Sequence, residues 1–243
     1  MGPRTAEKTE RTGSDPLPVR AVLSVLIPAY NERDTIVEAL RRVRELGPDV
    51  EIIVVDDASS DGTGAILEQE AGIVYVRHEQ NQGKGAAIRT ALSRVTGDVV
   101  AIQDADLEYN PQDLLRLMQP IVAGECQVVY GSRFLNGRPR MALPNYICNR
   151  LLALTANLLF GARITDEATC YKVFSAKLIT ALPLECRRFE FCPEVTARIC
   201  KKGERIVELP IQYEPRTYDS GKKIRWWDGV SALWTLLKYR FRD

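Results

Sequence analysis

Short apolar runs alternate with helix-patterned segments through the first half of this chain. The runs have the length and the β-branched content of buried strands. They cover residues 21–27, 51–55, 73–77, 98–102 and 127–130. The segments between them space apolar residues as one face of a helix does, at residues 31–46, 62–70, 85–95 and 111–122. This alternation with short connections predicts an α/β fold, a Rossmann-like, mostly parallel sheet flanked by helices.

The pattern changes after about residue 140. Strands are expected at 169–174 and 205–213, and helices at 144–160, 176–182, 190–201 and 226–240. The helices at 144–160 and 226–240 are amphipathic. Residues 1–20 mix Pro, Gly, Ser, Thr and charge without periodicity and are interpreted as a disordered leader.

Composition excludes several classes of protein. Lys plus Arg total 33 and Asp plus Glu total 32, so the basic surplus of a nucleic-acid-binding protein is missing. The longest apolar stretch without formal charge, residues 151–162, is too short for a membrane-spanning helix, which needs about 20 residues. The polar N-terminus carries no signal peptide. None of the six cysteines forms a CxxC pair, which favours reduced, buried thiols over a zinc or redox site.

Acidic and polar clusters follow three of the predicted strands. They are residues 28–32 (PAYNE), 56–62 (DDASSDG) and 104–106 (DAD). The carboxyl ends of parallel strands meet at one edge of a sheet, so these clusters are expected to converge. Two carboxylates two residues apart, Asp104 and Asp106, suit Mg²⁺ or Mn²⁺, which prefer oxygen ligands and accept phosphate oxygens as further ligands. A solvated loop is the alternative reading of an isolated Asp-x-Asp.

A glycine-rich turn at residues 81–87 (NQGKGAA) places Lys84 at the start of a helix. Glycine permits close backbone approach, and a helix N-terminus favours anions. The pattern is not a P-loop. A plain turn and a diphosphate-binding turn both fit it, and the neighbouring acidic pair favours the diphosphate. The only histidine, His78, is interpreted as structural.

Taken together, the motifs SVLIPAYNE, VVDDASSDGT, NQGKGAAIR, DADLE, GSRF and TCYKVF resemble the family-2 glycosyltransferases of the GT-A fold. Within that family the chain is similar to polyprenyl-phosphate sugar synthases, such as the dolichyl-phosphate mannosyl- and glucosyltransferases. The resemblance implies one GT-A domain over residues 21–243. Its nucleotide-binding half would be 21–135 and its acceptor-side half 136–243.

The resemblance also implies a role for each matching residue. The base and ribose would be held by Pro28, Tyr30 and Glu32. Asp57 would hydrogen-bond the base, with Asp56 close by, and Lys84 would lie near the nucleotide. Asp104 and Asp106 would bind the metal, Mg²⁺ or Mn²⁺, and through it the diphosphate. Glu108 stands where relatives often carry Gln and is a candidate third ligand. Phosphates would be contacted by Arg133, Arg216, Ser220, Lys222 and Lys223.

The implied reaction is an inverting transfer of a hexose from GDP-mannose or UDP-glucose to a polyprenyl or dolichyl phosphate. A phosphate monoester has its second pKa near about 6, so a phosphate acceptor needs no strong general base. A saccharide hydroxyl does need one, and Glu190 is then the nearest candidate. Transfer to a saccharide hydroxyl and a non-catalytic nucleotide-binding module stay open as alternatives. So do the identity of the sugar and the choice between GDP and UDP.

The C-terminal segment favours contact with a membrane. Residues 216–243 carry seven Lys or Arg against three Asp, interleaved with Trp226, Trp227 and Trp234. Tryptophan with basic residues is typical of an interfacial helix. The expected location is cytoplasmic, peripherally attached to the cytoplasmic face of a membrane. Packing on the sheet, a membrane-protein partner or a homodimer would also occupy such helices, and the oligomeric state stays open.

Overall fold

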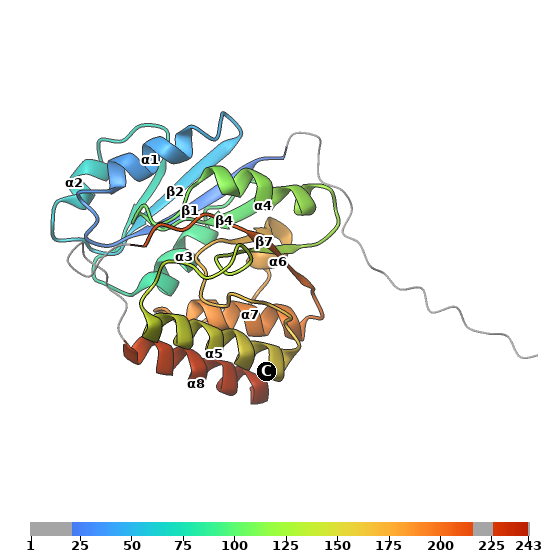
Figure 1. The fold of residues 1–243 in the computed structure, drawn as a ribbon. Helices are drawn as coiled ribbons and strands as arrows, with labels where there is room; N and C mark the ends of the chain where they lie inside the picture. Colours follow the sequence, from blue (N-terminus) through green and yellow to red (C-terminus); the bar gives the residue numbers. More distant parts are fainter. Residues whose placement is uncertain (1–20, 216–225, 243) are drawn as a thin grey trace, which may run out of the picture.

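One seven-stranded sheet runs through the molecule in the order β3-β2-β1-β4-β6-β5-β7 (Figure 1). The structure, a computed structural model, describes residues 21–215 and 226–242. The strands are β1 (Leu23–Ala29), β2 (Val50–Asp56), β3 (Val74–Arg77), β4 (Val99–Ile102), β5 (Val128–Ser132), β6 (Lys172–Ser175) and β7 (Ile206–Pro210). β6 is antiparallel to both its neighbours, and the other pairings are parallel. The predicted α/β class with a mostly parallel sheet is confirmed.

The helices bury one stripe each against this sheet or against one another. They are α1 (Ile36–Arg44), α2 (Thr63–Leu67), α3 (Lys84–Leu92), α4 (Gln112–Val122), α5 (Leu143–Phe160), α6 (Ala176–Thr180), α7 (Phe191–Lys201) and α8 (Trp226–Phe241). In α1 the buried residues Ile36, Ala39, Leu40 and Val43 follow the three-and-four spacing of a single helical face. That spacing is why the segment forms a helix on the sheet.

The first strand and first helix differ in extent from the sequence prediction. Pro28 was expected to end the strand, but β1 continues through it to Ala29. β4 pairs with β1 only as far as Leu26, so the missing N–H of Pro28 lies beyond that pairing. The helix begins at Ile36 rather than Asn31, because Asn31 adopts a left-handed conformation with φ of 51°.

Three helices form a separate layer beneath the β6–β5–β7 half of the sheet, where α5, α7 and α8 pack against one another (Figure 1). A buried carboxylate ties this layer together. Glu194 of α7 accepts hydrogen bonds from the Tyr239 hydroxyl of α8 (2.7 Å) and from the backbone N–H groups of Glu185 and Cys186 (2.8 Å each). The position of α8 is therefore fixed by a specific polar contact as well as by apolar packing.

None of the helices in the described ranges has both the length and the apolar content needed to cross a bilayer. All six cysteines are free. The sequence indicated buried thiols, but only Cys170 is buried and the other five are half-buried.

Candidate active site

The loops that follow β1 and β2 are held together by reciprocal hydrogen bonds. The backbone N–H of Asn31 donates to Ser59 Oγ (2.9 Å), and the N–H of Ser60 donates to Asn31 Oδ1 (2.8 Å). These bonds use the left-handed turn at Asn31 to satisfy two backbone donors. Two of the predicted clusters therefore form one connected rim at the carboxyl edge of the sheet.

The three residues predicted to hold base and ribose at the first strand lie along this rim. Pro28 is half-buried inside β1, and the Tyr30 side chain is 39% exposed just beyond it. The backbone N–H of Glu32 donates to Thr63 Oγ1 (2.9 Å), and Glu32 Oε2 accepts from the hydroxyl of Thr35 (2.9 Å). The ring of Tyr30 is thus accessible in the loop that follows β1.

The two consecutive aspartates after β2 serve different partners. Asp56 is fully buried, accepts the backbone N–H of Ser59 (2.9 Å) and lies 3.6 Å from Arg77 Nε. Those contacts turn Asp56 into the protein, where it shapes the loop. Asp57 points to the opposite side, toward the glycine-rich turn.

Asp57 anchors the glycine-rich turn through its carboxylate. Oδ1 accepts the backbone N–H of Gln82 (2.8 Å) and lies 2.7 Å from His78 Nδ1, while Oδ2 accepts the N–H of Gly83 (2.7 Å). The turn is thereby held against the end of β2, and Lys84 follows as the first residue of α3.

The glycines of this turn are required by packing. A Cβ on Gly83 would lie 2.5 Å from the carbonyl oxygen of Arg187, and one on Gly85 would lie 2.7 Å from that of Cys186. Gly83 also has φ of +96°. The N–H of Ala86 donates to the Arg187 carbonyl (2.9 Å), so one N–H in the first turn of α3 is already used within the protein.

Lys84 reaches across to the predicted metal-binding pair. Its Nζ lies 2.6 Å from Asp104 Oδ1, with both side chains about one-fifth exposed. Burial alone would lower the pKa of the Lys84 ammonium, but the charge of Asp104, its hydrogen bond to Lys84 and smaller contributions from nearby cysteines together raise that pKa above its ordinary value. Lys84 therefore stays charged beside Asp104, and its ammonium group suits contact with a bound anion.

Asp104 and Asp106 both follow the end of β4, and Glu108 comes two residues later. Asp106 Oδ1 accepts the backbone N–H of Glu108 (3.1 Å), across a left-handed Leu107 with φ of 62°. Among residues 21–215 and 226–242 no three Asp, Glu, His or Cys side chains gather as a ready metal cluster. The donor set is thus two carboxylates, which fits a Mg²⁺-type ion that takes its other ligands from phosphates and water.

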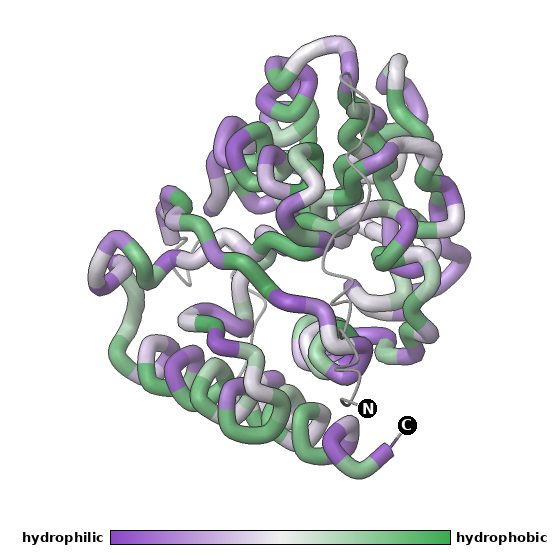
Figure 2. The backbone as a smooth tube through the Cα atoms, turned by 90° about the vertical axis from the view of Figure 1, so that its right-hand side faces the viewer, coloured by the Kyte–Doolittle hydropathy of each residue, from purple (hydrophilic) through white to green (hydrophobic). Residues whose placement is uncertain are grey.

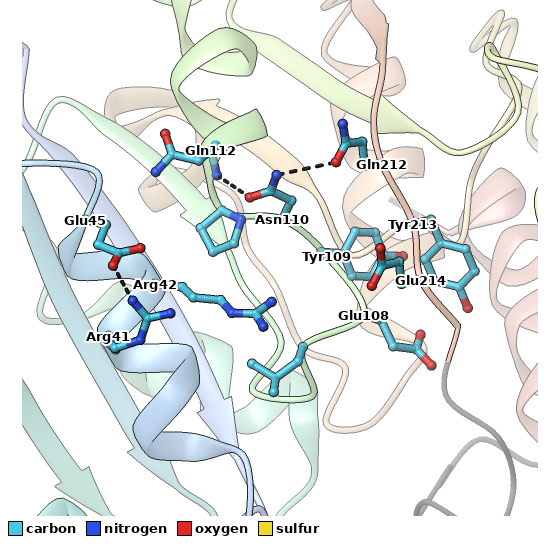
Figure 3. Close-up of a pocket in the computed structure, with 12 residues that line it drawn as sticks. Arg41, Arg42, Glu45, Glu108, Tyr109, Asn110, Gln112, Gln212, Tyr213 and Glu214 are labelled. Carbon is cyan, nitrogen blue, oxygen red and sulfur yellow. Dashed lines mark hydrogen bonds and ion pairs between the residues drawn. The ribbon is translucent and has the colours of Figure 1, made fainter.

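Glu108 instead belongs to a cleft of about 350 Å³ on the α1 side of this loop (Figure 3). Tyr109 and Tyr213 line the cleft and pair as an isolated antiparallel bridge with ring centroids 5.4 Å apart. The N–H of Glu214 donates to the carbonyl of Glu108 (2.9 Å). Burial and then the charge of Glu108 raise the pKa of Tyr213.

Four of the predicted phosphate ligands lie outside the described residues. They are Arg216, Ser220, Lys222 and Lys223. Glu214, two residues before Arg216, hydrogen-bonds the loop that carries Asp104 and Asp106.

Arg133 of the GSRF motif is engaged by a buried aspartate. Its Nε and one terminal nitrogen each lie 2.7 Å from an oxygen of Asp166, and its backbone N–H donates to Asp166 Oδ2 (3.0 Å). The guanidinium also lies 5.1 Å from the ring centroid of Tyr213. This bidentate pair orients Arg133 at the end of β5 and leaves fewer of its donors for a phosphate.

We expect Asp166→Ala to destabilise the fold by about 3 to 5 kcal/mol, because it leaves the buried Arg133 guanidinium without its counter-charge. Chemical denaturation followed by circular dichroism measures this loss. Arg41→Ala breaks an ion pair to Glu38 on the exposed face of α1 and is the control expected to leave the unfolding midpoint in place. Equal effects of the two substitutions would contradict the assignment.

Sequence reasoning missed the buried polar group that surrounds Asp166. Glu167 and Lys172 are fully buried, and Lys172 Nζ donates to the Glu167 carbonyl (2.5 Å) and lies 3.9 Å from the ring centroid of Tyr130. Burial raises the pKa of Glu167, and one of its carboxyl oxygens has no hydrogen-bond partner among the described residues. The available signal was the Asp-Glu pair just before TCYKVF, because charges next to a buried strand need partners.

Solved structures show which class of fold this architecture belongs to. Glucosyl-3-phosphoglycerate synthase from Mycobacterium tuberculosis, crystallised with Mn²⁺, uridine diphosphate and phosphoglyceric acid, superposes with a TM-score of 0.68. It is 23% identical, over 91% of this chain and 79% of that one. Mannosyl-3-phosphoglycerate synthase from Rubrobacter xylanophilus also has a TM-score of 0.68, at 20% identity over 90% and 72%. The fold is therefore that of the GT-A glycosyltransferases.

The sequence places the chain within that class. Residues 24–181 match the family model of Glycosyl transferase family 2, and the chain belongs to this family. Polyprenol monophosphomannose synthase of Mycolicibacterium smegmatis is 32% identical over 90% of this chain and 89% of its own length. Undecaprenyl-phosphate mannosyltransferase of Micrococcus luteus is 30% identical over 88% and 97%. The protein is a glycosyltransferase, and the resemblance read from its motifs is confirmed.

Proposed function

We propose that this glycosyltransferase moves a hexose from a nucleoside diphosphate to a polyprenyl phosphate, with inversion at the anomeric carbon and with a bound Mg²⁺ or Mn²⁺. The observation that carries the proposal is the contact between Lys84 and Asp104 at the carboxyl edge of the sheet, two residues before Asp106. The relatives named above act, by their names, on polyprenol or undecaprenyl phosphate. Residues 21–243 would form the whole catalytic domain.

The donor half of the site would use residues already placed. Asp104 and Asp106 would hold the divalent ion, which would stabilise the charge that grows on the departing diphosphate. Lys84, kept charged by Asp104, would contact the same diphosphate. Tyr30, Glu32 and Asp57 would face the nucleoside from the loops after β1 and β2. Asp56 would shape the loop from inside and not touch the ligand.

The acceptor half supports a phosphate over a hydroxyl. Near neutral pH a phosphate monoester is already largely deprotonated, so it attacks without a strong base. Glu190, the base that the sequence offered, is engaged elsewhere, and so is His78, which the sequence indicated to be structural. Glu190 Oε1 accepts from Ser231 of α8 (3.0 Å), and His78 is bound to Asp57 and Thr90. Arg133, aimed by Asp166, would lie toward the acceptor together with the cations at 216, 222 and 223.

An apolar surface on α5 and α8 would bring the enzyme to its lipid substrate. We call it the two-helix face. It is formed by the exposed residues Leu143, Ile147, Leu151, Leu154 and Leu158 of α5 and Trp227, Val230, Trp234, Leu237 and Phe241 of α8. The helices run side by side and parallel: a Cβ on Gly229 would lie 2.6 Å from Cys148 Sγ, near the start of each helix. Figure 2 shows hydrophobic residues, in green, along the helices at the bottom of the view.

The charges around the two-helix face favour an anionic bilayer as its occupant. Residues 134–163 contain no Asp or Glu but four arginines, at 138, 140, 150 and 163, all exposed. The end of α8 and the residue after it add the exposed Lys238, Arg240 and Arg242. A second copy would bring the same positive rim against this one, whereas anionic lipid complements it. Tryptophans at the level of lipid headgroups are typical of such surfaces.

The proposed reaction is tested by transfer of label from UDP- and GDP-hexoses to polyprenyl phosphate in anionic vesicles, with Mg²⁺ or Mn²⁺. We expect a labelled lipid that is labile to mild acid, no product after chelation of the metal, and a new anomeric bond of opposite configuration. Labelling of a saccharide with lipid phosphate ignored would support the hydroxyl alternative. Nucleotide binding without transfer to either acceptor would support a non-catalytic module.

A further inference from the structure

His78 is buried between three elements and makes two side-chain contacts. It follows β3, its Nδ1 lies 2.7 Å from Asp57 Oδ1 at the end of β2, and its Nε2 lies 2.9 Å from Thr90 Oγ1 on α3. His78 is 8% exposed. A carboxylate is an acceptor only, so the proton shared with Asp57 must be on Nδ1. The two contacts thus fix the orientation of the ring and place an N–H on Nδ1.

The acceptor capacity of Asp57 can be counted. A carboxylate offers about four lone-pair positions. His78 and the Gln82 N–H take those on Oδ1, and the Gly83 N–H takes one on Oδ2. Within the part of the chain that the structure describes, one position on Oδ2 is therefore not taken by a protein donor.

The resemblance to the family already implies that Asp57 hydrogen-bonds the base. We propose that His78 is a positioning residue for that contact: it holds Asp57 so that the remaining Oδ2 position accepts a ring N–H from the nucleobase. This inference rests on the proposed function, because it needs a nucleotide at this edge of the sheet. Uracil and guanine carry a ring N–H of this kind. Cytosine and adenine carry a ring lone pair at the corresponding position, which a carboxylate repels. His78 thereby links the folded core to the choice of UDP or GDP over CDP or ADP.

Matched ligands and matched variants test this role. UDP and CDP differ only in the ring N–H and the neighbouring exocyclic group. GDP differs from ADP in the same two features and also in its 2-amino group. Calorimetry in Mg²⁺ should show that UDP or GDP binds at least about tenfold more tightly than its partner. His78→Gln cannot present an N–H where Nδ1 stands and should shrink that ratio to about threefold or less. His78→Asn, whose amide nitrogen lies near the Nδ1 position, should retain most of it.

A second measurement needs no variant. Because the chain has one histidine, protein labelled with ¹⁵N-histidine gives a single imidazole signal pair. We expect a protonated Nδ1 in the free protein and a shift of that signal that saturates with UDP or GDP. Pyrophosphate, which has no base, should leave it in place. Thermal melts would show whether each variant is folded.

The possible outcomes separate the two proposals. If UDP and GDP bind but the Nδ1 signal stays still and His78→Gln keeps full discrimination, the positioning role is overturned while the enzymatic proposal stands. A protonated Nε2 with bare Nδ1 in the free protein would also overturn it. If neither nucleotide binds the folded chain, both proposals fail. A saturating Nδ1 shift together with lost discrimination in His78→Gln supports the role.

Discussion

Asp106→Asn is expected to lower the rate of hexose transfer by roughly 10³-fold while leaving the fold intact. The substitution keeps the size of the side chain and removes the charge that the divalent ion needs. Asp106 is only half-buried and receives the Glu108 backbone N–H, a bond that the amide oxygen of Asn also accepts. The loss should therefore fall on kcat and on metal affinity, measured by transfer assays over a range of Mn²⁺ concentrations.

The matched control removes a charge at the other edge of the sheet. Glu125 is exposed in the turn before β5, so Glu125→Gln changes the net charge equally without approaching the site. We expect its activity to stay within about twofold of the parent, as for an ordinary surface substitution. Asp106→Asn protein that transfers at the parental rate, with an unchanged thermal midpoint, would remove the metal site from this position.

Glu108→Gln separates the two acidic positions further. Glu108 lines the cleft with Tyr213 and Glu214, and no three-residue metal cluster forms among the described residues, so the same assay should show a much smaller loss than for Asp106. A loss as large as that of Asp106→Asn would make Glu108 a direct ligand after all.

Local pattern was enough to predict the elements of the fold. Each expected strand and helix overlaps one in the structure, because buried strands and amphipathic helices can be recognised from the spacing of their apolar residues. The convergence of the loops after β1, β2 and β4 also followed, since it depends only on parallel strand direction. The limits were at Pro28 and Asn31. There, tertiary contacts with β2 and with Ser59 decided where an element ends.

The partners of the site residues were beyond local pattern. Asp56 and Asp57 are adjacent in sequence and chemically identical, yet one faces Arg77 and the other the glycine-rich turn. Gly83 and Gly85 suggested a phosphate turn, but the structure shows that the backbone at 186–188 already requires them to be small. Asp166 is 33 residues from Arg133 and was invisible as its partner. Such pairings depend on which distant segments the fold brings together, and no spacing rule encodes them.

The second large effect is expected at the two-helix face. Leu154→Glu combined with Trp234→Glu should weaken binding to anionic vesicles by roughly 100-fold. Full burial of one such side chain contributes about 1.5 to 3 kcal/mol, and 1.4 kcal/mol corresponds to tenfold in affinity. Two partly inserted side chains therefore account for about two decades, and the added charges are repelled by the lipid headgroups. Co-sedimentation with vesicles of stated anionic content measures the loss.

The double variant should fold as the parent does. Leu154 is 52% exposed and Trp234 is 66% exposed, so neither supports the core. Val37→Glu is the matched control, because Val37 is a 50% exposed apolar residue on α1, away from the α5, α7 and α8 layer. It should bind vesicles as the parent does.

Two acceptors then separate docking from chemistry. With long-chain polyprenyl phosphate in vesicles, the double variant should lose activity in step with its membrane binding. With a short, water-soluble polyprenyl phosphate it should keep the parental rate, because Lys84, Asp104 and Asp106 are untouched. If vesicle binding persists while a dimer of the parent falls apart, the occupant of the two-helix face is a second copy. The exposed Arg138, Arg140 and Arg150 argue for lipid, because an anionic surface complements their charge.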